Sequence, residues 1–205
     1  MIITQEQSFA DTGKGVWSAF SIKQDQGLYL RKIDAEMRFN QDGDIIDQFL
    51  AGLATGYQIN RHWQLWLGSK FAFNDQDVVG DQQEIRLSEQ AIFVQDSFSF
   101  RSKIEQRKAL TQPAIANRLR ERIGYHHKLS SHFSLKLYNE LFINLNQVSW
   151  ILPKTLDQNR LFLGLSHQSS KHLAVTVGYL YQSVFSNPVV NNQIVKLSVV
   201  YLPGA

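Results

Sequence analysis

Apolar and polar side chains alternate along most of this chain with a period of two residues. In the last segment, Val195, Leu197, Val199 and Tyr201 occupy every second position. Successive side chains of a β-strand point to opposite faces, so the pattern predicts strands with one apolar and one polar face. The polar face carries more charge than an ordinary core holds, which is typical of a membrane-spanning β-barrel with a wet interior.

The alternation divides the chain into eleven predicted strands. All four prolines fall between or after them, at positions where no hydrogen-bond donor of a β-ladder is lost. The predicted strands are Gly15 to Lys23, Leu28 to Phe39, Ile45 to Gln58, His62 to Phe73, Gln82 to Gln95, Phe98 to Ala109, Asn117 to Lys128, His132 to Leu145, Gln158 to His167, His172 to Val184 and Asn192 to Leu202.

An odd number of strands conflicts with the even numbers found in single-chain bacterial barrels. A further strand over Ile2 to Phe9 gives twelve, whereas removing Gly15 to Lys23 from the wall gives ten. We predict an all-β, closed antiparallel up-and-down transmembrane barrel of twelve strands, with ten as the alternative. It forms a single domain over residues 1–205, of which residues 1–12 are expected to be a loosely ordered segment.

The connections between the predicted strands alternate between short and long. Outer-membrane barrels have short periplasmic turns and longer external loops, and a soluble sandwich has no reason to sort its loops in this way. Aromatic side chains support the same location, because Trp and Tyr gather at membrane interfaces. We predict one aromatic girdle beside the short turns, formed by Tyr57, Trp63, Tyr125, Phe133 and Tyr201.

Composition narrows the class of protein without fixing its function. The chain has 205 residues, no cysteine and a formal charge of +3, which gives no case for nucleic-acid binding. Its apolar runs are far shorter than the roughly 20 residues of a spanning helix. The polar start, Met1 to Gly13, does not read as a signal peptide. We therefore expect a mature outer-membrane protein whose signal peptide is gone, with a cytosolic start as the competing interpretation.

Several short motifs resemble one bacterial family. They are Asp11-Thr12-Gly13 with Val16-Trp17, Arg38-Phe39-Asn40, Tyr138-Asn139-Glu140-Leu141-Phe142, Asp157-Gln158-Asn159-Arg160 with Phe162 and Gly164, and Gly178-Tyr179-Leu180-Tyr181-Gln182. In this order the set resembles the uncharacterised family called domain of unknown function 2490. The resemblance implies an outer-membrane β-barrel of Gram-negative bacteria and implies no reaction, because none is established for the family.

Charged residues dominate the polar face, and we expect them to form a charge network in the lumen. Its predicted members are Arg101, Lys103, Glu105, Arg107, Arg118, Arg120, Arg122, Lys136, Glu140 and Arg160. One interpretation is an ion-paired plug in which Glu105 and Glu140 neutralise the arginines, since small barrels are filled by side chains. The other is an anion-binding or conducting lumen, because the sixth and seventh segments place six bases against one acid.

Three polar residues interrupt the apolar face as an outward polar row: Glu89, Glu121 and Asn139. Pairing about the Leu129 to Ser131 turn places Glu121 opposite Asn139. The first interpretation is a bulge that turns these side chains inward toward the arginines. A subunit contact comes second, and a site for an enzyme acting on lipid comes third.

No catalytic, cofactor or metal site emerges from the sequence. Ser102 faces outward, but His127 lies at a different height on the wall, so the two do not form a catalytic pair. His126 and His127 point to opposite faces of their strand and so do not form a metal site. We predict a non-enzymatic outer-membrane barrel, either structural or an anion-preferring pore for small solutes, whose partners are outer-membrane lipids and a small anionic solute. A lipid-modifying hydrolase is the alternative, and a soluble lipocalin-like barrel is the second alternative.

Overall fold

The computed structural model describes residues 12–39, 46–74 and 82–203. These residues form eleven β-strands, and all four prolines lie outside them. Each strand overlaps one of the eleven segments predicted from the alternation. The strands are β1 (Thr12–Gln26), β2 (Tyr29–Phe39), β3 (Ile46–Gln58), β4 (Trp63–Asn74), β5 (Gln82–Gln95), β6 (Phe98–Ala109), β7 (Ile115–Lys128), β8 (Phe133–Asn144), β9 (Leu156–Ser170), β10 (Leu173–Val184) and β11 (Val190–Tyr201).

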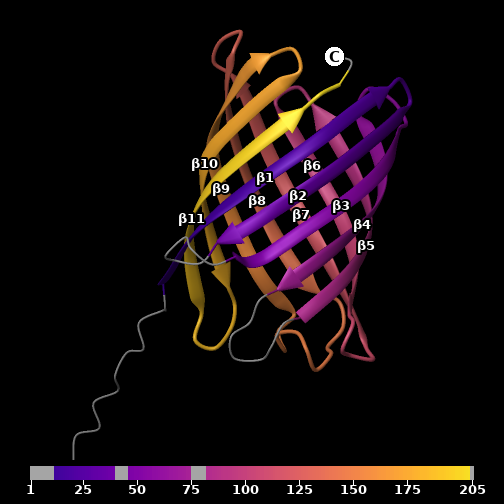
Figure 1. Ribbon diagram of the computed structural model, residues 1–205, viewed down its shortest axis with the longest axis vertical. Helices are drawn as coiled ribbons and strands as arrows, with labels where there is room; N and C mark the ends of the chain where they lie inside the picture. The colour runs from indigo at the N-terminus through magenta and orange to yellow at the C-terminus, as the bar shows by residue number, and fades with distance from the viewer. Residues whose placement is uncertain (1–11, 40–45, 75–81, 204–205) are drawn as a thin grey trace, which may run out of the picture.

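The strands form one closed barrel in which consecutive strands are antiparallel neighbours. The barrel closes through β1 and β11, which pair in parallel from Thr12↔Asn191 to Ile22↔Tyr201. Figure 1 shows the two strands side by side, with their arrowheads toward the same end of the barrel. An up-and-down barrel with an odd number of strands must bring its first and last strands together in parallel.

The predicted count of twelve and the all-antiparallel closure are therefore not confirmed. β1 and β11 already pair directly, and β1 is a full strand of the wall, which also excludes the ten-stranded alternative. The strand proposed over Ile2 to Phe9, and nearly all of the segment 1–12, lie outside the described residues. The assumption of an even number was wrong, whereas the direct count of alternating segments was right.

The connections separate the barrel into two ends. One end carries the short turns 27–28, 59–62, 96–97, 129–132 and 171–172, and we call it the short-turn end. The other carries the longer connections 40–45, 75–81, 110–114, 145–155 and 185–189, and we call it the long-loop end. The predicted alternation of short and long connections is confirmed. Gly27 enables the first turn because its φ of 70° is a conformation that other residues rarely adopt.

Alternation along the strands gives the barrel an apolar outer wall and a polar lumen. Large apolar side chains such as Leu53, Leu67, Ile123 and Leu163 are half or more exposed on the outside. Buried charged and polar groups such as Glu105 lie within. This orientation is opposite to the one that the soluble lipocalin-like alternative requires. In the described ranges there is no helix long and apolar enough to cross a membrane.

A small apolar cluster fills the lumen beside the parallel seam. Trp17, Phe162, Leu180 and Ile194 are buried together, and Tyr138 packs against them. The Phe162 ring lies over Gly164 of its own strand β9 and Gly178 of β10, which leave the space that it occupies. This part of the barrel is therefore closed by side-chain packing, which leaves the charged residues to line the rest of the lumen.

Candidate functional site: the charged lumen and the outer-wall polar row

Strand parity places every predicted member of the lumenal charge network on the inner face. On β6 and β7 the charged residues occupy alternate positions of an unbroken antiparallel register, so they share one face. On β8 and β9, Glu140 pairs with Arg160 across the ladder and both are buried. The network therefore spans at least four adjacent strands on one side of the lumen.

Glu105 of β6 is the centre of the network and is only 3% exposed. Its carboxylate accepts hydrogen bonds from Arg118 and Arg120 of β7, each at 2.8 Å, and forms an ion pair with Lys103 at 2.8 Å. A carboxylate without water requires several donors to offset its lost hydration. Three cations around one buried carboxylate meet that requirement and hold the neighbouring strands together.

Glu140 of β8 forms a second centre beside the first. Its Oε1 accepts hydrogen bonds from Arg120 at 2.6 and 2.9 Å, and it also forms an ion pair with Arg101. Arg120 therefore bridges both carboxylates. The Phe142 ring lies below the Arg120 and Arg160 guanidinium groups, at 4.4 and 4.6 Å from its centroid. Cation–π contact adds to the ion pairs where water is excluded.

Two acids of this region were missed by the sequence analysis. Glu84 of β5 is buried and pairs with Arg86 and Arg107, both at 2.9 Å. Its place on the inward register could have revealed it. Asp157 of β9 is the extra residue of a register shift opposite Phe142 and Ile143, so parity assigns it to the wrong face. It is buried and accepts a hydrogen bond from Arg118 at 3.0 Å.

Acids from neighbouring strands reduce the predicted excess of positive charge on β6 and β7. Arg107 pairs with Glu84, Arg118 with Glu105 and Asp157, and Arg101 and Arg120 with Glu140. The six bases therefore face four acids rather than one. The long-loop half of the lumen forms a dense layer of these pairs, which we call the ion-paired layer: Glu84, Arg107, Glu105, Arg118, Arg120, Glu140 and Asp157.

Three further bases, Lys23, Arg122 and Lys136, lie toward the short-turn end. No acidic side chain of the described residues forms a salt bridge with Lys23, Arg122 or Lys136. Arg122 lies over the Tyr138 ring at 5.0 Å, and Lys136 donates a hydrogen bond to Thr176 at 3.2 Å. Lys23 of β1 interacts electrostatically with Arg122 of β7 and Lys136 of β8, and also with Lys32 and Asp34 of β2. We call this group the cationic vestibule.

The vestibule is more open than the ion-paired layer. Lys23 is exposed and Arg122 and Lys136 are partly exposed, whereas Glu105 and Glu140 are each 3% exposed. Paired side chains therefore fill the lumen beside β5 to β9, and the side chains of the vestibule are more exposed. A polar pocket of about 330 Å³, lined by residues such as Trp17, Arg38 and Asn74, lies in the lumen at the long-loop end.

The outward polar row lies on the outer wall, so the bulge interpretation is wrong. The registers of β4 to β8 run without a shift past Glu89, Glu121 and Asn139. Glu121 lies opposite Leu141, not Asn139, because the β7–β8 hairpin is centred one residue later than predicted. A change of two residues in the pairing preserves the face of each side chain, so their outward direction was still correct.

Each residue of the row forms a hydrogen bond with a polar side chain on the wall. Ser102 donates a hydrogen bond to Glu121 at 2.6 Å, and Gln106 donates one to Glu89 at 3.1 Å. Asn139 donates to the side chain of Asn159 at 3.0 Å. The sequence analysis missed Gln106 and Asn159, although the same outward parity identifies both.

The five predicted girdle residues lie on the outer wall near the short turns. Tyr57 contacts Tyr29 and Trp63 contacts Phe93, with ring centroids 5.8 and 5.0 Å apart. Tyr125 contacts Phe98 at 5.1 Å. Two histidines extend the set, because His167 lies 4.7 Å from Phe133 and His172 lies 6.4 Å from Tyr201. These contacts group the aromatic side chains of the short-turn end into pairs.

In this barrel, charged side chains line the lumen and large apolar side chains face outward. A soluble barrel has the opposite arrangement. That inverted arrangement makes the chain a porin-like β-barrel. It belongs to the family described as protein of unknown function, DUF2490, whose profile matches residues 14–193.

A solved structure with a similar fold is the NanC porin in its rhombohedral crystal form. The TM-score is 0.53 and the sequence identity is 12%, over 82% of this chain and 85% of that chain. Similarity at this identity concerns the fold alone. No curated protein matches the chain.

Proposed function

We propose that this barrel resides in the bacterial outer membrane and admits small anions into its lumen from the short-turn end. The observation that carries the proposal is the cationic vestibule, where Lys23, Arg122 and Lys136 form no salt bridge with an acidic side chain of the described residues. Glu140 lies opposite Arg122 in the ladder but forms its salt bridges with Arg101 and Arg120. Like charges facing one another across a narrow lumen raise the local potential and concentrate anions. A carboxylate or phosphate bound between them would remove this repulsion.

The ion-paired layer determines how far such a solute can travel. Glu105, Arg118 and Glu140 are almost fully buried, and their ion pairs join β6, β7, β8 and β9, while the pair of Arg107 with Glu84 adds β5. Passage from the vestibule to the long-loop end requires these side chains to exchange protein partners for water or solute. We therefore propose anion entry and binding as the primary event, with a small conductance through the layer.

Reversal potentials in planar bilayers test this proposal. With the purified full chain and a KCl gradient across the bilayer, we expect anion preference. Arg122→Gln combined with Lys136→Gln should reduce it, because each substitution removes an unpaired lumenal cation. Arg31→Gln is the matched control, since Arg31 lies on the outward register of β2. Cation selectivity of the wild type would contradict the proposal.

We further propose that the barrel is not an enzyme. Ser102 is an outward hydroxyl beside a carboxylate, because it donates a hydrogen bond of 2.6 Å to Glu121. An activated serine normally requires a base that is in turn oriented by a third group, and no histidine contacts this pair in the described residues. Incubation with labelled phospholipid and lipid A should give no turnover. Product release that is abolished by Ser102→Ala would support the hydrolase alternative instead.

A further inference from the structure

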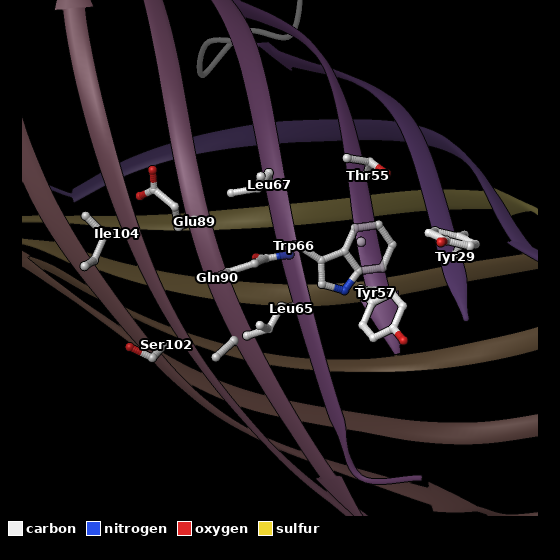
Figure 2. Close-up of a pocket in the computed structure, with 12 residues that line it drawn as sticks. Tyr29, Thr55, Tyr57, Leu65, Trp66, Leu67, Glu89, Gln90, Ser102 and Ile104 are labelled. Carbon is white, nitrogen blue, oxygen red and sulfur yellow. The ribbon is translucent and has the colours of Figure 1, made fainter. Parts of the chain in front are cut away.

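One hollow of the barrel lies on the outer wall and another lies within the lumen. Figure 2 shows Leu65 and Leu67 in the first, between Glu89 and Tyr57. The second lies at the long-loop end and is lined largely by polar side chains. Its volume of about 330 Å³ falls within the range of sites that bind small molecules. We call it the lumenal pocket.

Four amide side chains line the lumenal pocket. Gln182 and Asn192 are partners in the ladder of β10 and β11, and Gln48 and Asn74 are partners in that of β3 and β4. Each pair therefore occupies one level of the wall, on either side of the parallel seam. Gln182 and Asn74 are only 7% and 8% exposed, so their polar atoms depend on partners inside the barrel.

Hydrogen bonds within the barrel use only part of what these amides offer. A side-chain amide carries two N–H donors and an oxygen that accepts two hydrogen bonds. Gln48 donates once, to Asn74, and accepts once, from Arg38. Gln182 donates once, to Gln158, and accepts once, from the amide of β11 at 3.4 Å. In the described part of the chain, Gln48 and Gln182 thus each retain one donor and one acceptor position.

Spare donors and spare acceptors together indicate the chemistry of the ligand. An anion needs donors alone and a metal ion needs acceptors alone, so either would lie against amide groups of the wrong polarity. A hydroxyl group donates and accepts at one atom, and it therefore satisfies both kinds of position. Trp17 and Ile194 add apolar surface to the same pocket, which suits the C–H groups between hydroxyls.

The charged side chains of the pocket do not favour an ionic ligand. Arg38 lies over the Trp17 ring at 3.9 Å and forms a salt bridge with Glu36 at 2.6 Å. Lys14 and Asp47, both exposed, carry opposite charges. The charges of the lining therefore nearly balance, unlike those of the cationic vestibule.

We propose that the lumenal pocket binds a neutral solute with several hydroxyl groups, such as a small polyol or sugar. The spare positions of Gln48 and Gln182 bind two of its hydroxyl groups from opposite sides, and Trp17 and Ile194 contact its carbon chain. This site lies at the opposite end of the lumen from the cationic vestibule, so the proposal is separate from anion entry.

Saturation-transfer NMR on the full chain in detergent micelles tests the proposal, with sorbitol as the probe. We expect saturation transfer to the C–H protons of sorbitol. Gln48→Met and Gln182→Met should each weaken sorbitol binding about fivefold, as the loss of one hydrogen bond does. Gln90→Met is the matched control and should leave the affinity unchanged. Gln90 lies outside the pocket on the inward register of β5, opposite Trp66 in the ladder, and Figure 2 shows the two side by side.

Heat-modifiable gel mobility shows whether each variant still folds. Gln48 is only partly buried, so Gln48→Met keeps the test valid if Gln182→Met fails to fold. A wild type that transfers no saturation to sorbitol would overturn the proposal, and so would equal affinities in all three variants. Displacement of sorbitol by sodium acetate would also overturn it, because the ligand would then be an anion. Ion selectivity is measured separately, so a failure here leaves the proposed function unaffected.

Discussion

At the residue scale, the lumen is stabilised by carboxylates that each serve several cations. Glu105 and Glu140 are almost fully buried, and Arg120 bridges them. Such a network contributes little when complete, because burial of its charges costs nearly what their attraction returns. Removing one member destabilises the barrel strongly, since the remaining charges stay buried without a partner.

Glu140→Gln is therefore expected to destabilise the barrel by about 3–5 kcal/mol. The substitution keeps the size of the side chain but leaves Arg101 without its carboxylate and Arg120 with one of two. Urea unfolding of the refolded protein in detergent measures the change. Asp25→Asn is the control, because Asp25 is exposed at the end of β1 and should have little effect. Equal stability of Glu140→Gln and wild type would show that the ion pairs do not form.

Two lumenal glycines differ in how much space surrounds them. A Cβ at Gly178 would lie 2.5 Å from both the Leu163 carbonyl oxygen and the Phe162 ring. A Cβ at Gly124 would meet the Ser99 hydroxyl, which can rotate away, and otherwise nothing closer than 3.7 Å. The first position is constrained by backbone and a packed ring, and the second by one movable side chain.

We expect Gly178→Ala to destabilise the barrel by about 1–3 kcal/mol, as overpacking of a filled core does. Gly124→Ala is expected to be nearly neutral. Thermal unfolding in detergent, followed by loss of heat-modifiable gel mobility, compares the two variants. If both behave alike, Phe162 does not occupy the space above Gly178.

At the element scale, the parallel pairing of β1 and β11 is the feature that the sequence analysis did not anticipate. Eleven alternating segments were recognised, and eleven strands formed. The error came from a rule about typical barrels, not from the residues. Strand partners are chosen by closure of the whole sheet, and no local pattern near Val16 or Val195 indicates that they lie opposite each other.

A crosslink across this seam is expected. Val16 and Val195 are directly paired and both face outward, so cysteines at these positions should join readily with a short thiol crosslinker. Tyr179 pairs with Val195 one strand further along. Val16→Cys with Tyr179→Cys is therefore the matched control and should react poorly. A strand inserted between β1 and β11 would abolish the first crosslink.

At the scale of the whole molecule, the outer wall is apolar and the lumen is charged, which is the reverse of a soluble protein. Leu163 is half exposed near the middle of β9, and Phe133 is 42% exposed at the start of β8. If the wall contacts lipid, a charge should be costly at the first position and mild at the second, because the cost falls from the midplane toward the interface.

Leu163→Arg should cost about 2–4 kcal/mol and Phe133→Arg at most about 1 kcal/mol. The free energy of folding into lipid vesicles, measured from urea titrations, gives both values. In a water-exposed wall, the two substitutions would cost similar small amounts. That result, or solubility without detergent, would contradict a membrane location.

The sequence by itself determined the strands, the two faces and the sorting of the connections. These features depend on the period-two pattern and on proline and turn positions, which act within a few residues. The same local information assigned Arg118 and Arg120 to the lumen and Glu89 and Glu121 to the outer wall.

Only the tertiary structure decided the strand number, the parallel seam and the pairing of charges. Glu84, Glu140 and Asp157 lie on three different strands and form ion pairs with bases of β6 and β7. Asp157 reaches its partner because of a register shift in β9. Which cations form no salt bridge follows from contacts between residues far apart in the sequence, such as Arg101 with Glu140 and Arg118 with Asp157, each 39 positions apart. Such contacts depend on closure of the barrel, which no local pattern specifies.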